Sequence, residues 1–403
     1  MEIFNKYYLP ICIFIILIAG FNIFYSLELL PINDWDEARH GVTAFEMNQS
    51  GNYLITTYQD YPDYWNLKPP LGSWLIAISY QIFGNNTFAL RFPSALAALL
   101  CIILMMYLAK QIYNSQVSIL SGIVLTTGFW FIFMHCGRTG DFDAQMTLLV
   151  ILTILFLLKT DTKTIYFCLT GLCFSLAFLL KSYLAIQILL IVGCYLIFTK
   201  KFELIKLRHY IIFIFFASAP ILFWAIARFN YDGLKFFQTM VEYDLVKKSF
   251  NGLEGHNENI FYYIYSSIWG LFPWSLFPIG ILFLWKKLKI KLNYSKSPIL
   301  LIWILVPFIL FSLAFTKCYW YIYPTYPALA ILIGLALNKL FTNKPQSKFL
   351  LIVFLMFFIT AEARSIIFIE IEKNKSYQPI STSSANHLTQ AQVFERKVLN
   401  RVK

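Results

Sequence analysis

The stretch Asp34–Leu71, DWDEARHGVTAFEMNQSGNYLITTYQDYPDYWNLKPPL, is a polar, acid-bearing segment held between long apolar segments. The flanking apolar runs reach roughly 20 residues, the length an α-helix needs to cross a hydrocarbon core of about 30 Å. The stretch places beside that membrane the charged side chains of Asp36, Glu37, Arg39 and Lys68. Such a loop needs a purpose beyond connecting two spans, and it is the first candidate for a functional site.

The composition predicts an all-α integral membrane protein. Of the 403 residues, 59% are hydrophobic, 19% are aromatic and only 13% are charged, which is too apolar for a soluble domain of this size. Because lipid offers no hydrogen-bond partners to the backbone, the spans should be helices. We expect about eleven of them. They cover residues 9–30, 88–109, 117–134, 142–158, 164–180, 182–199, 210–228, 260–285, 298–315, 319–338 and 349–369.

The charge distribution predicts the topology. If Lys6 lies inside, the short loops on that side carry most of the Lys and Arg residues, whereas the opposite loops hold most of the acids. Lys and Arg favour cytoplasmic loops, so we expect a cytoplasmic N-terminus. Residues 1–369 would form one membrane domain with outside loops at 31–87 and 229–259, and 370–403 would be a short polar outside tail. This topology accounts for the net charge of +12, so no nucleic-acid partner is expected.

The first outside loop predicts two short helices. Asp34 is a plausible N-cap for a helix over 36–49, which Gly51 would end. Pro62 and the Pro69-Pro70 pair then break the chain before an amphipathic helix over 71–83. Helices of this kind lie along the membrane interface.

On the helix over 36–49, Asp36, Arg39 and His40 share one face because residues three and four apart are neighbours. That face could flank a substrate. The alternative is an exposed ion pair between Asp36 and Arg39, which contributes little.

Lys68 stands immediately before Pro69-Pro70 and the helix that follows. A cation is unfavourable at the positive end of a helix dipole unless an anion lies between them. A helix N-terminus together with a lysine forms a phosphate site, so Lys68 is a candidate ligand for phosphate. The alternative is a solvated lysine.

The run Arg138-Thr-Gly-Asp141-Phe-Asp143 opens the fourth span. A carboxylate in the membrane costs about 2.5–3.5 kcal/mol at the centre and less near the edge, which favours a function for Asp143. The alternative for Asp143 is a helix-start carboxylate stabilised by the dipole and by Arg138, and this plainer interpretation is favoured for Asp141.

Two further segments on the outer side of the membrane contain candidate site residues. His256 closes the second outside loop and is ordinarily a hydrogen-bonding surface residue. Lys317 opens the tenth span and could help to bind a phosphate. The aromatic residues that follow Lys317 are typical of an interfacial belt.

Taken together, these motifs resemble the membrane glycosyltransferases with the multi-helix C-type fold, the group that contains the protein O-mannosyltransferases and the aminoarabinose transferase of lipid A modification. The motifs follow the family's order over most of the chain. They are Asp36-Glu37-Ala38-Arg39, Glu46-Met47, Gly51-Asn52-Tyr53, Lys68-Pro69-Pro70-Leu71, Phe83-Gly84 with Arg91, Asp143 with Thr147, Gly255-His256, Pro273-Trp274, and Lys317 with Tyr321 and Pro324-x-x-Pro327.

The resemblance implies inverting transfer of one hexosyl or pentosyl group from a polyprenyl phosphate to an acceptor hydroxyl on the outer side of the inner (plasma) membrane. Asp36 would be the general base, and Asp143 a second carboxylate near the acceptor or sugar. The donor phosphate would be bound by Arg39, Lys68, Lys317 and Tyr321. Further candidate substrate contacts are Glu37, Asp141 and His256. Cationic residues are suited to this role, because cations held in place by the protein stabilise the negative charge that develops on the leaving phosphate.

The chain departs from the aminoarabinose transferases at Leu67. That subgroup has a glutamate there, which helps to bind a divalent metal together with the histidine matching His256. Leu67 cannot ligate a metal, although Asp63 or Glu258 could substitute for the glutamate. A divalent metal is therefore possible but does not follow from the resemblance, and no cofactor is assigned. The tail is also shorter than the family's extension.

Two other classes of protein fit the many helices. A transporter or flippase of a lipid-linked glycan is the main alternative, but transporters often have inverted repeats and interrupted helices at mid-membrane, and neither is evident in the sequence. A structural membrane subunit would leave Asp36, Lys68 and Asp143 without a shared purpose. The sequence does not name the sugar, and the acceptor could be a lipid such as lipid A, a cell-surface glycan or a protein.

Overall fold

The computed structural model describes residues 6–203, 205–247, 258–277, 298–343, 348–376 and 389–399. Nearly all regular structure in these ranges is helical. The exception is a two-stranded antiparallel hairpin of β1 (Thr57–Tyr58) and β2 (Tyr61–Pro62). The all-α fold predicted from the apolar runs is confirmed.

Six helical stretches among the described residues are long and apolar enough to cross a membrane. They are Tyr8–Leu29, Thr87–Ile112, Ile165–Phe198, Leu207–Asp232, Tyr319–Thr342 and Lys348–Asn374. Three shorter apolar helices coincide with other predicted spans, namely α6 (Ser115–Thr126), α8 (Asp143–Leu157) and α16 (Pro298–Leu313). The chain is therefore a multi-pass membrane protein, as its composition predicts.

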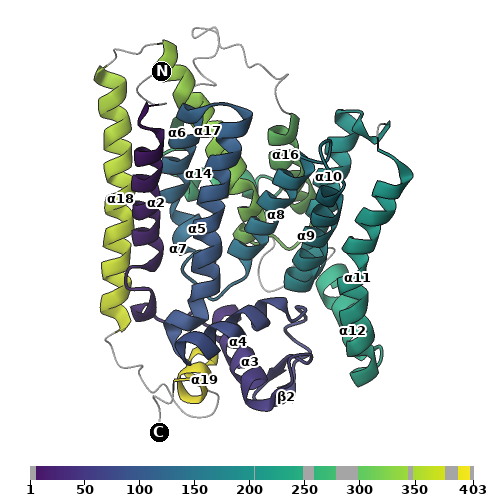
Figure 1. The fold of residues 1–403 in the computed structure, drawn as a ribbon. Coiled ribbons are helices and arrows are strands. Elements are labelled where there is room, and N and C mark those ends of the chain that lie inside the picture. Colours follow the sequence, from purple (N-terminus) through teal and green to yellow (C-terminus); the bar gives the residue numbers. More distant parts are fainter. Residues whose placement is uncertain are drawn as a thin grey trace.

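The bundle consists of long helices that run side by side (Figure 1). They are α2 (Tyr8–Phe24), α5 (Thr87–Ile112), α9 (Ile165–Lys181), α10 (Ile186–Phe198), α11 (Leu207–Asp232), α17 (Tyr326–Asn343) and α18 (Lys348–Ser376). Within it, α5 packs on α6 and α8, α8 on α9, and α9 on α11. Shorter elements connect or flank these helices: η1 (Leu27–Leu29), α7 (Phe129–Phe133), η2 (Ser182–Ala185), η3 (Lys201–Glu203), α12 (Lys235–Met240), the π-helix η4 (Val241–Lys247), α14 (Tyr262–Gly270) and η6 (Tyr319–Thr325).

Three predicted spans differ in detail. The span over 117–134 is divided into α6 and α7 at Gly128, whose backbone is extended. The span over 260–285 contains α14, which ends at Gly270, and Pro273 soon after cannot continue a helix; its residues 278–285 lie outside the described ranges. The span over 319–338 opens with the 3-10 helix η6, which contains Pro324, and becomes α-helical in α17.

The first loop folds largely as predicted. Helix α3 (Asp36–Ser50) ends at Gly51, which has φ +69° in the left-handed region where glycine is favoured. The amphipathic helix α4 (Leu71–Phe83) has the expected bounds. The N-cap prediction was wrong, because Trp35 occupies that position with φ +69°. Asp34 instead accepts a hydrogen bond from the backbone N–H of Ala391 at 2.6 Å.

The end of the chain packs on this loop. Helix α19 (Gln390–Lys397) lies with α3 and α4 at one end of the bundle (Figure 1). Its Phe394 is fully buried next to Gly41 of α3. Its Lys397 Nζ lies 2.5 Å from Glu46 Oε1 and 2.8 Å from Asp60 Oδ2. Part of the predicted tail is thus a helix that covers α3.

Candidate active site

The polar centre of the molecule is assembled from four segments. Asp36 is the first residue of α3, and Lys68 lies just before α4. The loop between α7 and α8, residues 134–142, brings two more polar side chains and leads into Asp143 at the start of α8. Lys181 ends α9. Residues up to 145 positions apart in the chain therefore meet in space.

Asp36 lies between the side chains of a lysine and a histidine. Its Oδ2 is 3.1 Å from Lys68 Nζ and 3.9 Å from His135 Nε2. Burial raises the pKa of Asp36, but the Lys68 ammonium next to it favours the carboxylate, so the pKa lies below its ordinary value. The carboxylate is therefore ionised at neutral pH and can accept a proton.

His40 fixes the position of Lys68. Burial and the Lys68 ammonium lower the pKa of His40 well below its ordinary value, so the imidazole is neutral. Its Nδ1–H donates to the Gly140 carbonyl at 3.1 Å, and its Nε2 accepts from Lys68 Nζ at 3.3 Å. The ring also stacks on Phe142, with 3.9 Å between ring centroids. These contacts hold the lysine beside Asp36.

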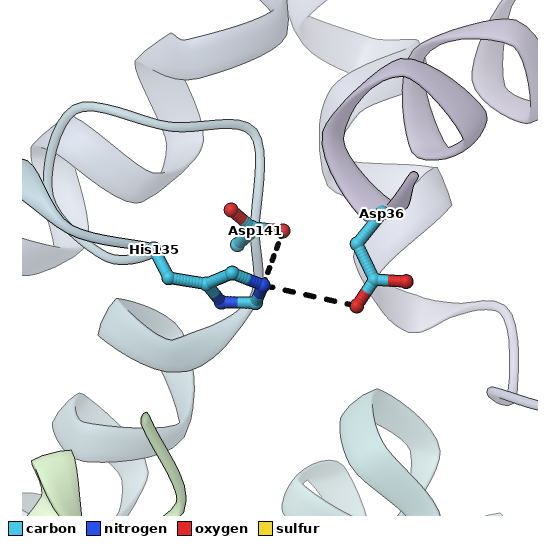
Figure 2. A group of neighbouring side chains, drawn as sticks. All are labelled: Asp36, His135 and Asp141. Atoms are coloured by element: carbon cyan, nitrogen blue, oxygen red, sulfur yellow. Dashed lines mark ion pairs between the residues drawn. The ribbon is translucent and has the colours of Figure 1, made fainter. Parts of the chain in front are cut away.

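His135 lies at the centre of three carboxylates. Its Nδ1 is 3.0 Å from Asp143 Oδ2, and its Nε2 is 3.4 Å from Asp141 Oδ1. Figure 2 shows Nε2 pointing between Asp141 and Asp36. Burial lowers the pKa of His135, but the surrounding carboxylates, Asp141 first, outweigh it and raise the pKa above its ordinary value. The ring stacks on Trp320, with 4.0 Å between centroids.

Asp141 is a buried acid of the site whose pKa is raised. Burial raises its pKa to about 6, against the opposing effect of His135. Its backbone position is fixed by the neighbouring Gly140, whose N–H donates to Glu37 Oε1 at 2.9 Å. Glu37 also makes a buried ion pair with Arg91 at 2.6 Å. Both oxygens of Glu37 are thus engaged within the protein, and the residue ties α3 to the Asp141 loop.

Asp143 is held from two sides. Its Oδ1 is 2.7 Å from Lys181 Nζ, and its Oδ2 accepts a hydrogen bond from His135. Asp143 and Lys181 are both buried, with side-chain exposures of 3% and 4%. A buried charge needs such a partner, since an unpaired one is costly.

Two cavities meet at Asp36. The larger, about 630 Å³, is lined by Asp36, His135 and Asp141 together with residues such as Asn33, Trp35 and Tyr319. The smaller, about 400 Å³, is lined by Asp36, Lys68 and Lys181 and by apolar residues that include Leu184, Ile186, Leu310 and Leu313. Trp65 and Trp320 also border both. One carboxylate therefore faces an acidic space on one side and a cationic, partly apolar space on the other.

Comparisons with known proteins show which proteins this chain is similar to. Residues 67–224 match the family described as dolichyl-phosphate-mannose-protein mannosyltransferase. The undecaprenyl phosphate-alpha-4-amino-4-deoxy-L-arabinose arabinosyl transferase 2 of Proteus mirabilis is 30% identical over 79% of this chain and 58% of its own length. The corresponding transferase 1 of Pseudomonas fluorescens is 27% identical over 80% of this chain and 57% of its own length. The chain thus spans less than two thirds of these relatives.

Solved structures show the same fold. The crystal structure of ArnT from Cupriavidus metallidurans bound to undecaprenyl phosphate superposes with a TM-score of 0.67 at 21% identity, covering 81% of this chain and 60% of that one. The Archaeoglobus fulgidus oligosaccharyltransferase gives a TM-score of 0.57 at 13% identity, over 94% of this chain and 57% of that one. The resemblance to the C-type membrane glycosyltransferases is confirmed. The fold class predicted from that resemblance is confirmed with it.

The structure brings together only some of the residues that this C-type resemblance singles out. Asp36, Asp141, Asp143 and Lys68 form the polar centre. Tyr321 lines the smaller cavity. His256 lies outside the described residues.

Arg39 and Lys317 line neither cavity, whereas Leu67 lines the smaller one. The Arg39 guanidinium lies 2.7 Å from Asp63 Oδ2 and stacks over Tyr58, and neither cavity includes Arg39 in its lining. The pairing of Arg39 with Asp36 considered from the sequence is thus replaced by one with Asp63. The Lys317 ammonium donates to the Ala314 carbonyl at 2.6 Å. Leu67 is buried in an apolar cluster with Leu179, Trp224, Phe236 and Met240.

His135 and Lys181 join the site without having been predicted. Lys181 had a detectable signal, since it is a lysine between two apolar runs, and ionisable residues there are functional candidates. His135 precedes the motif that begins at Arg138, and it has φ +58°, which is uncommon for a residue other than glycine. Two of its partners, Asp36 and Trp320, come from distant parts of the chain, and sequence spacing does not reveal them.

Proposed function

We propose that this protein is a glycosyltransferase that moves one sugar from a polyprenyl phosphate to an acceptor hydroxyl. The observation that carries this proposal is the position of Asp36 at the junction of the two cavities. Sugar transfer needs a base that contacts the acceptor hydroxyl next to the place where the donor binds. A transporter or flippase needs no such base, so the transferase is favoured over it.

The smaller cavity suits the donor. Lys68 and Lys181 supply two ammonium groups for a phosphate, and the apolar lining from Leu184 to Leu313 suits an isoprenoid chain. Cations held in place by the protein stabilise a leaving phosphate better than mobile ones, because no reorganisation is needed during the reaction. His40 and Asp143 hold these two lysines in place.

The larger cavity suits the acceptor. The acceptor hydroxyl gives its proton to Asp36, and its oxygen attacks the anomeric carbon of the sugar. The bond between that carbon and the phosphate oxygen breaks, and its electron pair leaves with the polyprenyl phosphate. Attack from the cavity opposite the phosphate inverts the configuration in a single displacement, without a covalent intermediate on the protein.

The relatives' names favour a 4-amino-4-deoxy-arabinosyl donor as the first substrate to test, which would make the reaction a pentosyl transfer. Hexosyl transfer is the alternative, in keeping with the mannosyltransferase family match. The acceptor is proposed to be a lipid, such as lipid A, or another cell-surface glycan.

The proposed location is the inner (plasma) membrane, with the N-terminus in the cytoplasm and the site on the outer side. The supporting observation is that α3, α4 and α19 gather at the bundle end opposite the N-terminus (Figure 1). Residues 1–369 would then be the membrane domain, and the residues from 370 would lie outside.

The test is sugar transfer by purified protein supplied with undecaprenyl-phosphate aminoarabinose and, in parallel, a polyprenyl-phosphate hexose, with lipid A as the acceptor. Asp36→Asn should lower the rate by about 10²–10⁴-fold, the usual contribution of a general base, while donor binding persists. The control is Asp161→Asn, which removes an exposed carboxylate paired with Lys201 away from both cavities. Turnover of Asp36→Asn at the control rate would refute the assignment of Asp36.

A further inference from the structure

We propose that Asp36, His135 and Asp141 bind one divalent transition-metal ion, Mn²⁺ or Zn²⁺, on the side of the larger cavity. Each of the three residues offers one ligand atom, and these atoms lie within 4.8 Å of one another. Figure 2 shows Asp36 at the start of α3 facing His135 and Asp141, which lie on the loop between α7 and α8. All three line the larger cavity, so the remaining coordination positions would face its contents.

The distances suit a small ion. His135 Nε2 is 3.4 Å from Asp141 Oδ1 and 3.9 Å from Asp36 Oδ2. Two ligands of a tetrahedral ion with bonds of about 2.1 Å are about 3.4 Å apart. The ligand atoms of Asp36 and Asp141 lie within 4.8 Å of each other. A movement of Asp36 by about an ångström toward both partners would complete three positions and leave at least one open.

The orientation of His135 is that of a metal ligand. A ligating histidine commonly donates its other ring N–H to a carboxylate, which fixes the tautomer and raises the basicity of the ligating nitrogen. Here Nδ1 lies 3.0 Å from Asp143 Oδ2, which in turn is held by Lys181 through its other oxygen. With the proton on Nδ1, the lone pair of Nε2 points toward Asp36 and Asp141.

Asp141 supplies a second, independent observation. Its side chain is only 2% exposed, and its Oδ1, the atom that faces His135 Nε2, has no hydrogen-bond partner among the described residues. A buried carboxylate oxygen is costly unless it is hydrogen-bonded, paired or bound to a metal. A metal ion between Asp141 and His135 would satisfy it.

The charges of the partners of the three aspartates also support a metal ion at this site. Lys68 pairs with Asp36 and Lys181 pairs with Asp143, whereas the partner of Asp141 is a histidine that is charged only when protonated. An imidazolium at His135 is the competing way to compensate Asp141. A divalent ion would do so while leaving the imidazole neutral.

The ligand set selects the class of metal. Carboxylates alone suit Mg²⁺, Ca²⁺ and Mn²⁺, whereas an imidazole ligand favours transition metals. One imidazole with two carboxylates therefore fits Mn²⁺ or Zn²⁺. This site uses neither Leu67 nor His256, so it differs from the metal site implied by the sequence resemblance.

The role of the ion rests on the proposed function, but its binding does not. A bound acceptor hydroxyl would become more acidic, and Asp36 could remove its proton more readily. Binding is therefore measured without any sugar substrate.

The experiment is titration of the full-length, tag-free protein in detergent with Mn²⁺, followed by electron paramagnetic resonance of the free ion, and with Zn²⁺ followed by elemental analysis. The wild type should bind one ion. Asp141→Asn and His135→Asn should each weaken binding by at least about tenfold, and Asp143→Asn, which orients His135, by about 10–100-fold. Asparagine is chosen at 135 because it tolerates the positive φ there.

Asp161→Asn is the matched control and should bind as the wild type does. Absence of Mn²⁺ and Zn²⁺ binding in the wild type would overturn the proposal and favour the imidazolium. Equal binding by the wild type and Asp141→Asn would also overturn it. Metal binding without sugar transfer would refute only the proposed function, and sugar transfer without metal binding would refute only the metal site.

Discussion

Lys181 Nζ lies 2.7 Å from Asp143 Oδ1, joining the end of α9 to the start of α8 across 38 positions of sequence. The two side chains are buried together beside the smaller cavity. The lysine compensates a buried carboxylate, and under the proposed function it also offers an ammonium group to the donor phosphate.

The first prediction concerns this pair. Lys181→Met should destabilise the protein by about 3–5 kcal/mol, because it leaves the buried Asp143 carboxylate without its lysine. Adding Asp143→Asn should recover part of the loss, since neither charge then remains. The measurement is the free energy of unfolding in detergent for the wild type, both single variants and the double variant. Strictly additive effects would show that the two side chains do not interact.

The second prediction concerns donor binding. Lys68→Met keeps the length of the side chain but removes the ammonium group, so the affinity for undecaprenyl phosphate should fall by about 10–100-fold, the usual worth of a charged hydrogen bond. Lys201→Met, which removes a lysine that pairs with Asp161 outside both cavities, is the control. Equal affinities for the two variants in a direct binding assay would exclude Lys68 as a phosphate ligand.

The third prediction separates structure from substrate binding at Glu37. Glu37→Gln should destabilise the fold by about 3–5 kcal/mol, because the Arg91 guanidinium is fully buried and would lose its counter-charge. Glu242→Gln, which breaks an exposed pair with Lys247, should leave the stability close to that of the wild type. A normal unfolding temperature together with a raised KM for Glu37→Gln would instead indicate direct contact with substrate.

The fourth prediction concerns the contact between α19 and α3. A Cβ at Gly41 would lie 2.4 Å from a ring carbon of Phe394, so Gly41→Ala should displace α19 and make it more sensitive to limited proteolysis. Phe394→Ala removes the ring, and in that background Gly41→Ala should have little additional effect. A double-mutant cycle measures this coupling. Independent effects would mean that α19 does not rest on Gly41.

The contact between α19 and the first loop can also be tested by measuring sugar transfer. Helix α19 contacts the loop that bears Asp36 and Lys68, and Lys397 pairs with Glu46 and Asp60 in that loop. We expect Lys397→Met to lower the transfer rate modestly without abolishing it, since Lys397 lines neither cavity. Complete loss of transfer with normal stability would point to a role in the chemistry itself.

The sequence by itself determined the helices and the first loop. Apolar runs of membrane-spanning length, Gly51 and the Pro69-Pro70 pair are local signals, and they predicted the all-α fold, the end of α3 and the start of α4. Asp36, Lys68 and Asp143 could also be identified as candidate site residues. A charged side chain next to lipid is costly whatever tertiary structure the rest of the chain adopts.

Only the tertiary structure decided which charges meet. His135 contacts Asp141 and Asp143 within one stretch of chain, but it contacts Asp36 only because α3 packs against that stretch, and no spacing along the chain encodes that packing. Arg39 pairs with Asp63 and lines neither cavity, whereas Lys181 lines the smaller cavity and pairs with Asp143 because α9 ends beside α8. Pairing of buried charges depends on distances of a few ångströms, and those distances are set by how the helices pack.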